Sequence, residues 1–205
     1  MKYQLDFSAK ISTVSPPITG AIVIGTSPLL FAAWQSSTWP AASTISPDEF
    51  IGVLKRIFEE SILGEVRSVI DDITKSNGTL AFRGHVVAIS MMCALDAISS
   101  YGYRGKKNGK FITAHFPAKY HPYADQIYEV FRLSLVHTWN LFEASLYADN
   151  SPIRLEGGTL AFGLLNFFDA LVTGTEYFLN CLPAGGDLLA NSINRYEELR
   201  TTAKP

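Results

Sequence analysis

Arg132 and His137 are the two residues of this chain whose types and spacing best suggest chemistry. A histidine titrates near neutral pH and can accept and donate a proton, and an arginine stays charged and binds oxyanions through paired N–H donors. Asn140 follows His137 by three residues. On a helix it would share a face with His137 and could fix its tautomer by a hydrogen bond. The residue types therefore suggest proton transfer beside a bound anion.

The segment that must position these residues is the run HPYADQIYEVFRLSLVHTWNLFEASLY, residues 121–147. Pro122 suits the first turn of a helix, and the next proline is Pro152. A wide apolar stripe then predicts a largely buried helix; it is formed by Ile127, Val130, Phe131, Leu133, Leu135, Val136, Leu141 and Phe142. On such a helix Arg132 and His137 project about 140° apart, so their side chains would converge only at the edge of a groove.

The run FRLSLVH, with its flanking Tyr120, Tyr123 and IYEVFR, resembles the R-x4-6-H signature of the HEPN superfamily. The resemblance covers residues 47–200 at most. It implies a small α-helical domain of a prokaryotic toxin–antitoxin or defence system, with Arg132 and His137 as the site pair. Catalytic members are metal-independent ribonucleases whose site is completed across a homodimer, and some toxins pair with an antitoxin protein.

Two functions of different classes follow. In a HEPN-type endoribonuclease the RNA supplies its own 2′-hydroxyl nucleophile. His137 would then act as general acid/base, and Arg132 would hold the scissile phosphate. The alternative is a catalytically inactive nucleotide/RNA-binding or protein-interaction module with the same fold. It is favoured by Leu133, which stands where active members usually carry a polar residue. Arg132 and His137 could also simply pair with neighbouring carboxylates.

A glycine-rich basic segment, YGYRGKKNGKFITAHFPAKY over residues 101–120, is predicted to be a loop. Its cations Arg104, Lys106 and Lys107 are candidate substrate-binding residues together with Asn140, because lysine and arginine contact nucleic-acid phosphates. A solvated loop without a ligand is the alternative. The glycines lack the spacing and the Ser/Thr of a phosphate-binding loop.

Composition limits the possible classes of protein. The 205 residues are 47% hydrophobic and 18% charged, which indicates one globular domain with a large core or a dimer interface. The net charge of −2 gives no overall nucleic-acid signature. Cys93 and Cys181 have apolar neighbours and are predicted to be buried thiols in a reducing cytoplasm. No cofactor or metal motif is present, and the apolar run 18–34 is too short for a confident membrane span.

The remaining elements follow from periodicity and from turn residues. Residues 1–45 are predicted to form a β-rich arm packed on the body, with a strand at 3–14. Residues 46–75 form a helix that begins with the capping box Ser46-Pro47-Asp48-Glu49. Residues 79–101, apolar on all sides, form the central helix, with Met91, Met92 and Cys93 in the core. Asp96, if buried on that helix, needs a partner, which Arg132 or His137 could supply; a capped or peripheral aspartate is the alternative.

Residues 153–162 are predicted to form a β-hairpin around Gly157-Gly158. A helix over 164–182 and a shorter terminal helix over 187–200 complete the chain. The predicted fold class is mainly α: an up-and-down, HEPN-like helical bundle over 46–205, with an N-terminal β-arm over 1–45 and a β-hairpin insertion.

Overall fold

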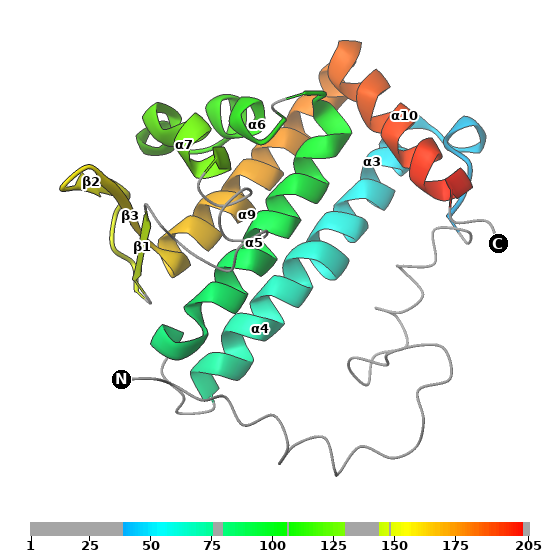
Figure 1. Ribbon diagram of the computed structural model, residues 1–205. Coiled ribbons are helices and arrows are strands. Elements are labelled where there is room, and N and C mark those ends of the chain that lie inside the picture. The colour runs from blue at the N-terminus through cyan, green and yellow to red at the C-terminus, as the bar shows by residue number, and fades with distance from the viewer. Residues whose placement is uncertain (1–38, 76–79, 106, 130–143, 148, 203–205) are drawn as a thin grey trace, which may run out of the picture.

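The computed structural model describes residues 39–75, 80–105, 107–129, 144–147 and 149–202. Figure 1 shows a mainly helical body with a small sheet at one side. The α-helices are α3 (Pro47–Arg56), α4 (Leu63–Lys75), α5 (Leu80–Gly102), α6 (Lys107–His115), α7 (Ala124–Tyr128), α9 (Leu164–Cys181) and α10 (Gly186–Thr202). The strands are β1 (Ala144–Tyr147), β2 (Arg154–Glu156) and β3 (Thr159–Gly163). Short 3-10 segments cover Ala42–Thr44, Ala118–Tyr123 and Leu182–Ala184.

The predicted helix over 46–75 is confirmed as one rod, made of α3, a π-helical segment Ile57–Ile62 and α4 (Figure 1). The capping box is present: the Glu49 backbone N–H donates to the Ser46 Oγ at 3.3 Å, and the Ser46 backbone N–H donates to the Glu49 carboxylate at 2.8 Å. The Glu49 carboxylate accepts from the Ser46 backbone N–H and also, at 2.9 Å, from the Ser46 Oγ, and these two bonds lower the pKa of Glu49. The four residues 46–49 were therefore enough to predict where the rod begins.

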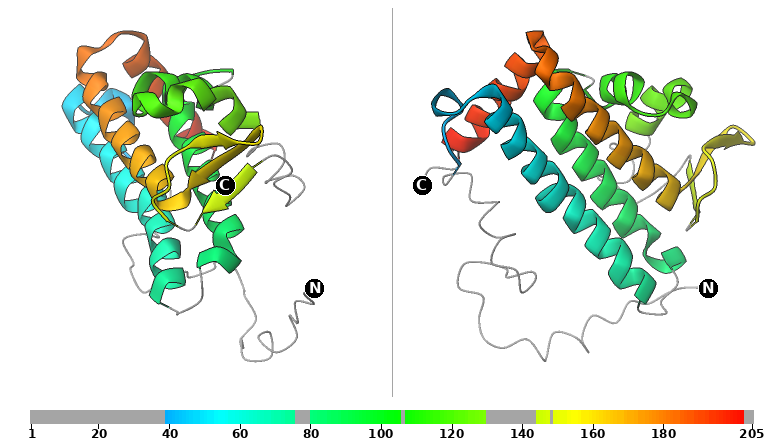
Figure 2. Two further views of the ribbon diagram at one scale, coloured as in Figure 1. Left: turned by 90° about the vertical axis from the view of Figure 1, so that its left-hand side faces the viewer. Right: turned by 180° about the vertical axis from the view of Figure 1, so that it is seen from behind.

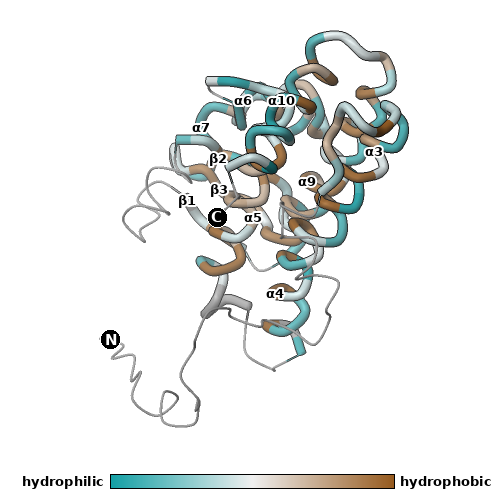
Figure 3. The backbone as a smooth tube through the Cα atoms, turned by 90° about the vertical axis from the view of Figure 1, so that its right-hand side faces the viewer, coloured by the Kyte–Doolittle hydropathy of each residue, from teal (hydrophilic) through white to brown (hydrophobic). Residues whose placement is uncertain are grey.

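The central helix is α5, which contacts α4, α6, α9 and α10 (Figure 2). Figure 3 shows hydrophobic colour along most of α5, whereas α4 alternates between hydrophobic and hydrophilic residues. The segment 84–102 is long and apolar enough to cross a membrane by length and composition, but it is 56% buried within the protein. We interpret it as the core helix of the bundle.

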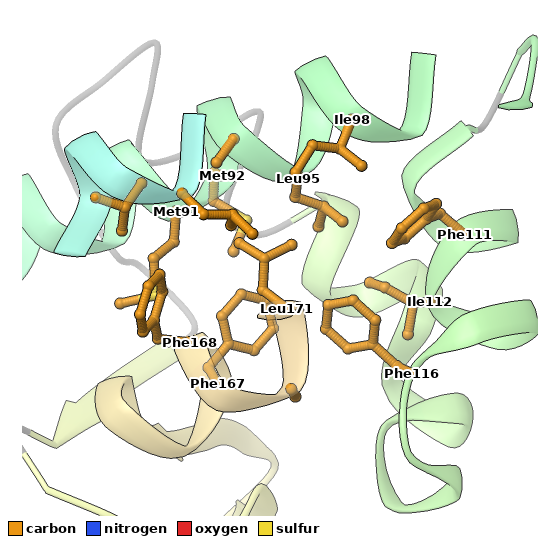
Figure 4. Close-up of a cluster of buried hydrophobic side chains, with 14 of the residues drawn as sticks. Met91, Met92, Leu95, Ile98, Phe111, Ile112, Phe116, Phe167, Phe168 and Leu171 are labelled. Carbon is orange, nitrogen blue, oxygen red and sulfur yellow. The ribbon is translucent and has the colours of Figure 1, made fainter. Parts of the chain in front are cut away.

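The hydrophobic core lies between the α3–α4 rod, α5, α6 and α9, and Figure 4 shows the part of it that surrounds Leu171. Met91 and Met92 are buried there, as predicted. The prediction was wrong for Cys93, which is exposed. The reason is that one side of α5 is exposed: Val86 lies two turns before Cys93, on the same side of the helix, and is 41% exposed.

The segment 101–120 is not the predicted loop, because it contains helix α6. Phe111 and Ile112 are fully buried, and Asn108 and His115 are buried one turn before and after them. This helical spacing of buried residues outweighs the glycines and lysines that suggested a loop. The basic residues consequently stand at the start of a helix rather than on a free loop.

The single helix predicted over 121–147 is also wrong at both ends. The chain forms a 3-10 turn to Tyr123, then the short helix α7, and residues 144–147 are strand β1. Strand β1 pairs in parallel with β3, from Ala144 opposite Leu160 to Tyr147 opposite Gly163. Its backbone groups are thus satisfied by a strand that is distant in sequence, which periodicity within the segment could not reveal. Residues 130–143 lie outside the described residues.

The predicted hairpin is confirmed as β2 and β3, which pair antiparallel with Arg154 opposite Ala161 and Glu156 opposite Thr159. Gly157 and Gly158 have φ values of 59° and 87°, as a two-residue turn of this kind requires. With β1 they form a three-stranded sheet in the order β1-β3-β2. The helices predicted over 164–182 and 187–200 are present as α9 and α10.

Residues 39–45 belong to the predicted N-terminal arm and pack on α10. The ring of Trp39 stacks on Tyr196 with centroids 5.2 Å apart, and the Tyr196 hydroxyl donates to the Pro40 carbonyl at 2.8 Å. Residues 42–44 form a 3-10 turn, not a strand. The predicted strand at 3–14 lies outside the described residues.

Gly163, where β3 joins α9, should not tolerate a side chain. A Cβ there would lie 2.3 Å from the Asp149 carbonyl oxygen and 2.5 Å from the Ser151 nitrogen, and both are backbone atoms. We expect Gly163→Ala to lower the free energy of unfolding by about 1–3 kcal/mol in urea denaturation. Gly52→Ala is the matched control, since it has no atom within 4 Å of the added Cβ and lies in helix α3. That variant should be neutral or stabilising by up to about 1 kcal/mol, and equal effects of the two changes would contradict the packing described.

Candidate functional site

A groove lies where the C-terminal end of α5, the start of α6, the end of α7 and one face of α10 meet. One part of it has a volume of about 590 Å³, and we call it the basic lobe. Its lining residues are Ser100, Tyr103, Arg104, Gly105, Lys107, Tyr128, Asn191, Arg195 and Glu198. Volumes of this order are typical of small-molecule sites.

A second part of the groove has a volume of about 330 Å³, and we call it the Asp96 lobe. It shares Ser100, Lys107, Tyr128 and Arg195 with the basic lobe. It adds Met92, Cys93, Asp96, Ala97 and Asn108. Both lobes thus carry two cations and one carboxylate, while Arg104 is found only in the basic lobe and the apolar wall of Met92, Cys93 and Ala97 only in the Asp96 lobe.

Helix α10 is held against α5 by polar contacts at the basic lobe. The Asn191 side-chain amide donates to the Gly102 carbonyl at 3.1 Å, and the Arg195 Nε donates to the Ser100 Oγ at 3.2 Å. Asn191, Arg195 and Glu198 follow one another at spacings of four and three, so they share one face of α10. These contacts fix where the Arg195 guanidinium enters the groove.

The three cations of the groove differ in their pairing. Lys107 Nζ lies 2.9 Å from the Asp96 carboxylate, and Arg195 Nη1 lies 2.8 Å from the Glu198 carboxylate. Arg104 is exposed, and within the described part of the chain its guanidinium has no ion-pair or hydrogen-bond partner. The basic lobe therefore offers one unpaired cation and two cations in partly exposed ion pairs.

Asp96 and Asn108 connect the first turn of α6 to α5. The buried Ser99 Oγ donates to the Asn108 Oδ1 at 2.6 Å, and the Asn108 Nδ2 donates to the Asp96 Oδ1 at 3.3 Å. Asp96 thus has Lys107 and Asn108 as partners among the described residues. Its predicted partners, Arg132 and His137, lie outside them, so that pairing stays a prediction.

The predicted substrate-binding residues Arg104 and Lys107 are brought together in the groove. Lys106, Arg132, His137 and Asn140 lie outside the described residues. Arg195, Asn191 and Tyr128 were missed from the sequence. Arg195 and Asn191 could have been found from the polar face that they form on α10, a segment for which only a terminal helix was predicted.

His115 is the buried histidine of the described part of the chain. Its Nε2 lies 2.8 Å from the Tyr103 hydroxyl, and its ring packs against Phe111 and Phe178. Burial lowers the pKa of His115 to about 4, and burial, with a smaller effect of Cys181, raises the pKa of Tyr103. His115 is therefore neutral at pH 7, and we interpret it as part of the core. The described residues that line the groove include no histidine.

Both cysteines are free thiols, as predicted, although neither is fully buried. Cys93 lines the Asp96 lobe, where burial and then the charge of Asp96 raise its pKa. This keeps the thiol protonated and poorly nucleophilic at neutral pH. Among the described residues, no group of three or more His, Cys, Asp or Glu side chains is placed to hold a metal ion.

The described residues of the groove can bind an anion and offer hydrogen bonds. Comparisons with protein-family models, with curated proteins and with solved structures found no match to this chain. The HEPN resemblance therefore rests on the sequence run around Arg132 and His137. The fold that the structure establishes is a mainly helical body with a three-stranded sheet.

Proposed function

We propose that this protein is a HEPN-like RNA-binding module whose basic lobe contacts RNA phosphates. The observation that supports the proposal is the convergence of Arg104, Lys107 and Arg195 on one concave surface. They come from the turn after α5, the start of α6 and the face of α10. Phosphate contacts of this kind supply most of the affinity for nucleic acid without requiring a particular sequence.

The ion pairs in the groove do not prevent phosphate binding. The side chains of Lys107 and Arg195 are 23% and 32% exposed, and those of their partners are 34% and 63% exposed. Ion pairs with this much solvent contact stabilise a protein by only about 0–1 kcal/mol. Lys107 and Arg195 can therefore each donate to a phosphate in addition to, or in place of, the paired carboxylate. Arg104 has no carboxylate to give up within the described residues.

Single-stranded RNA suits the groove better than a duplex. Tyr103 and Tyr128 line the basic lobe between the cations, and aromatic side chains among basic residues are the usual means of holding unpaired bases. The net charge of −2 argues against non-specific coating of a long polyanion. Binding should accordingly be local, and limited to a few nucleotides.

Arg104→Ala should weaken RNA binding without affecting folding, because the side chain is exposed and unpaired within the described part. We expect a loss of affinity of about three- to tenfold, as for a partly exposed charged contact. The slope of log K against log salt should fall by about 0.7, the value for one contact to a single strand. Fluorescence anisotropy of a labelled RNA oligonucleotide over a salt series measures both quantities.

Lys75→Ala is the matched control for that experiment. Lys75 is exposed and ends α4, whose far end lies at the opposite end of the body from α6 and α10 (Figure 1). This variant should bind RNA like the unmodified protein. If the two variants were equally affected, or equally unaffected, the basic lobe would not be the phosphate site.

A second candidate function is a metal-independent endoribonuclease that uses Arg132 and His137. The observation that favours it is positional: Arg132 follows Tyr128 by four residues, and Tyr128 lines both lobes of the groove. Chain connectivity keeps the Cα atoms of these two residues within about 15 Å of each other. The chain therefore tethers Arg132 to a residue that lines the groove.

In that reaction the RNA 2′-oxygen attacks the adjacent phosphorus and the bond from phosphorus to the 5′-oxygen breaks. A 2′,3′-cyclic phosphate and a 5′-hydroxyl result. His137 would take the proton from the 2′-hydroxyl or give one to the 5′-oxygen, and Asn140 would orient it. Arg132 would stabilise the charge on the phosphate oxygens. A homodimer would supply two copies of the pair, so that one could serve as acid and the other as base; an antitoxin-type protein would be the natural partner of such an enzyme.

A further inference from the structure

The two lobes of the groove differ in chemistry, and this difference points to the part of the ligand that each one holds. Lys107 and Arg195 line both lobes, and each lobe holds one carboxylate, Glu198 in the basic lobe and Asp96 in the other. Arg104 lines only the basic lobe, so its extra positive charge makes that lobe the better place for a phosphate. Met92, Cys93 and Ala97 line only the Asp96 lobe, so that lobe suits a flat, mainly apolar group that bears N–H donors. A nucleotide has both of these parts, joined by a sugar.

Asp96 has hydrogen-bonding capacity left for a ligand. A carboxylate offers about four acceptor sites. Within the described part of the chain, Lys107 occupies one on Oδ2, at 2.9 Å, and Asn108 occupies one on Oδ1, at 3.3 Å. The Asp96 side chain is 34% exposed and lines the lobe, so the carboxylate can accept further bonds from a ligand in the groove.

Lys107 adds a donor beside these two acceptors. Its ammonium carries three N–H donors, of which the Asp96 carboxylate takes one. The wall of the lobe therefore supplies one donor, the Lys107 Nζ, beside two acceptors, the oxygens of Asp96; we call these three atoms the Asp96–Lys107 row. The hydrogen bonds from Ser99 to Asn108 and from Asn108 to Asp96 hold this row in place from behind.

Guanine is the base whose free edge matches this row, since it presents the O6 acceptor followed by the N1–H and N2–H donors. Adenine and cytosine each place a ring-nitrogen acceptor where an Asp96 oxygen would need a donor, and uracil flanks its single N–H with two carbonyls. We infer that the Asp96 lobe is a guanine-binding pocket, in which Asp96 determines base specificity and Lys107 contacts O6. This inference rests on the proposed phosphate contacts of the basic lobe and specifies the nucleotide that they hold.

The test compares the dissociation constants of GMP, IMP, AMP, UMP and ribose 5-phosphate for the full chain, measured by NMR titration. GMP should bind at least about tenfold tighter than AMP or UMP, the discrimination expected from two matched hydrogen bonds. IMP lacks the N2 amino group, so it should fall between GMP and ribose 5-phosphate. This order separates base recognition from phosphate binding, which all five ligands share.

Asp96→Asn supplies the decisive variant. It keeps the shape of the side chain and the acceptor for Asn108, but it replaces the oxygen that pairs with Lys107 by an N–H donor and so removes that ion pair. An asparagine amide pairs with adenine through one donor and one acceptor, so this variant should lose the preference for GMP and gain affinity for AMP. A structural defect would weaken all five ligands and could not produce that gain.

Glu198→Gln is the matched control, because Glu198 is the carboxylate of the basic lobe and pairs with Arg195. Removing its charge should tighten the binding of all five ligands by a similar factor and leave the preference for GMP unchanged. Equal binding of the four nucleotides and ribose 5-phosphate would overturn the guanine pocket while leaving the phosphate site intact. Failure of all five ligands and of RNA to bind would overturn both proposals.

Discussion

Replacement of Phe58 by alanine is expected to lower the free energy of unfolding by about 3–5 kcal/mol, the range for a fully buried phenylalanine. Phe58 has no exposed surface and lies in the π-helical segment between α3 and α4. Its ring meets Tyr101 edge-on with centroids 5.0 Å apart, and it lies 6.2 Å from the ring of Phe178. It thereby joins the α3–α4 rod to both α5 and α9, and alanine would leave a cavity at this junction.

Urea denaturation followed by circular dichroism measures this loss. Val86→Ala is the control on α5, since Val86 is 41% exposed and its truncation should change stability by less than about 1 kcal/mol. A Phe58→Ala variant within 1 kcal/mol of the unmodified protein would contradict the packing of the rod against α5 and α9. The same loss of packing should also weaken ligand binding, because α5 carries Asp96 and forms one wall of the groove.

His137→Ala should reduce metal-free RNA cleavage by at least about 100-fold if the protein is an endoribonuclease. The reason is that the imidazole is the group proposed to transfer protons, whereas RNA binding is assigned to the cations of the basic lobe. The variant should therefore bind RNA with unchanged affinity. Cleavage of a labelled RNA in the presence of EDTA, beside anisotropy with the same oligonucleotide, measures both properties.

His85→Ala is the matched histidine control for the cleavage assay. His85 is half-buried on α5 and does not line either lobe of the groove, so its loss should leave cleavage unchanged. If the unmodified protein bound RNA but did not cleave it, the protein would be a binding module only. A loss of more than about 2 kcal/mol of stability in Arg132→Ala or His137→Ala would instead assign that residue to the structure.

Local sequence signals predicted those parts of the fold that depend on neighbouring residues. The capping box at Ser46 and Glu49 marked the start of the rod, and the two glycines at 157–158 marked the hairpin turn. In each case a few adjacent residues satisfy one another's backbone groups. Such signals do not depend on the rest of the fold.

The failures concern segments whose conformation is decided by distant partners. Strand β1 exists because β3 pairs with it, and α6 is a helix because Phe111 and Ile112 are buried in the core between α5 and α9 (Figure 4). The groove also depends on contacts between segments that are distant in the sequence. Arg104 and Lys107 could be proposed from their local clustering, but Arg195 joins them only through the contacts of α10 with α5.

We propose that RNA lies in the groove between α5, α6, α7 and α10, and photo-cross-linking would locate the bound RNA on the protein. A single-stranded RNA carrying 4-thiouridine would be irradiated with the protein, and the cross-linked peptides identified by mass spectrometry. We expect cross-links within residues 92–108, at Tyr128 and within residues 191–198, and we expect the Arg104→Glu variant to lose them. Cross-links confined to the hairpin at 154–163 or to the α3–α4 rod would contradict it.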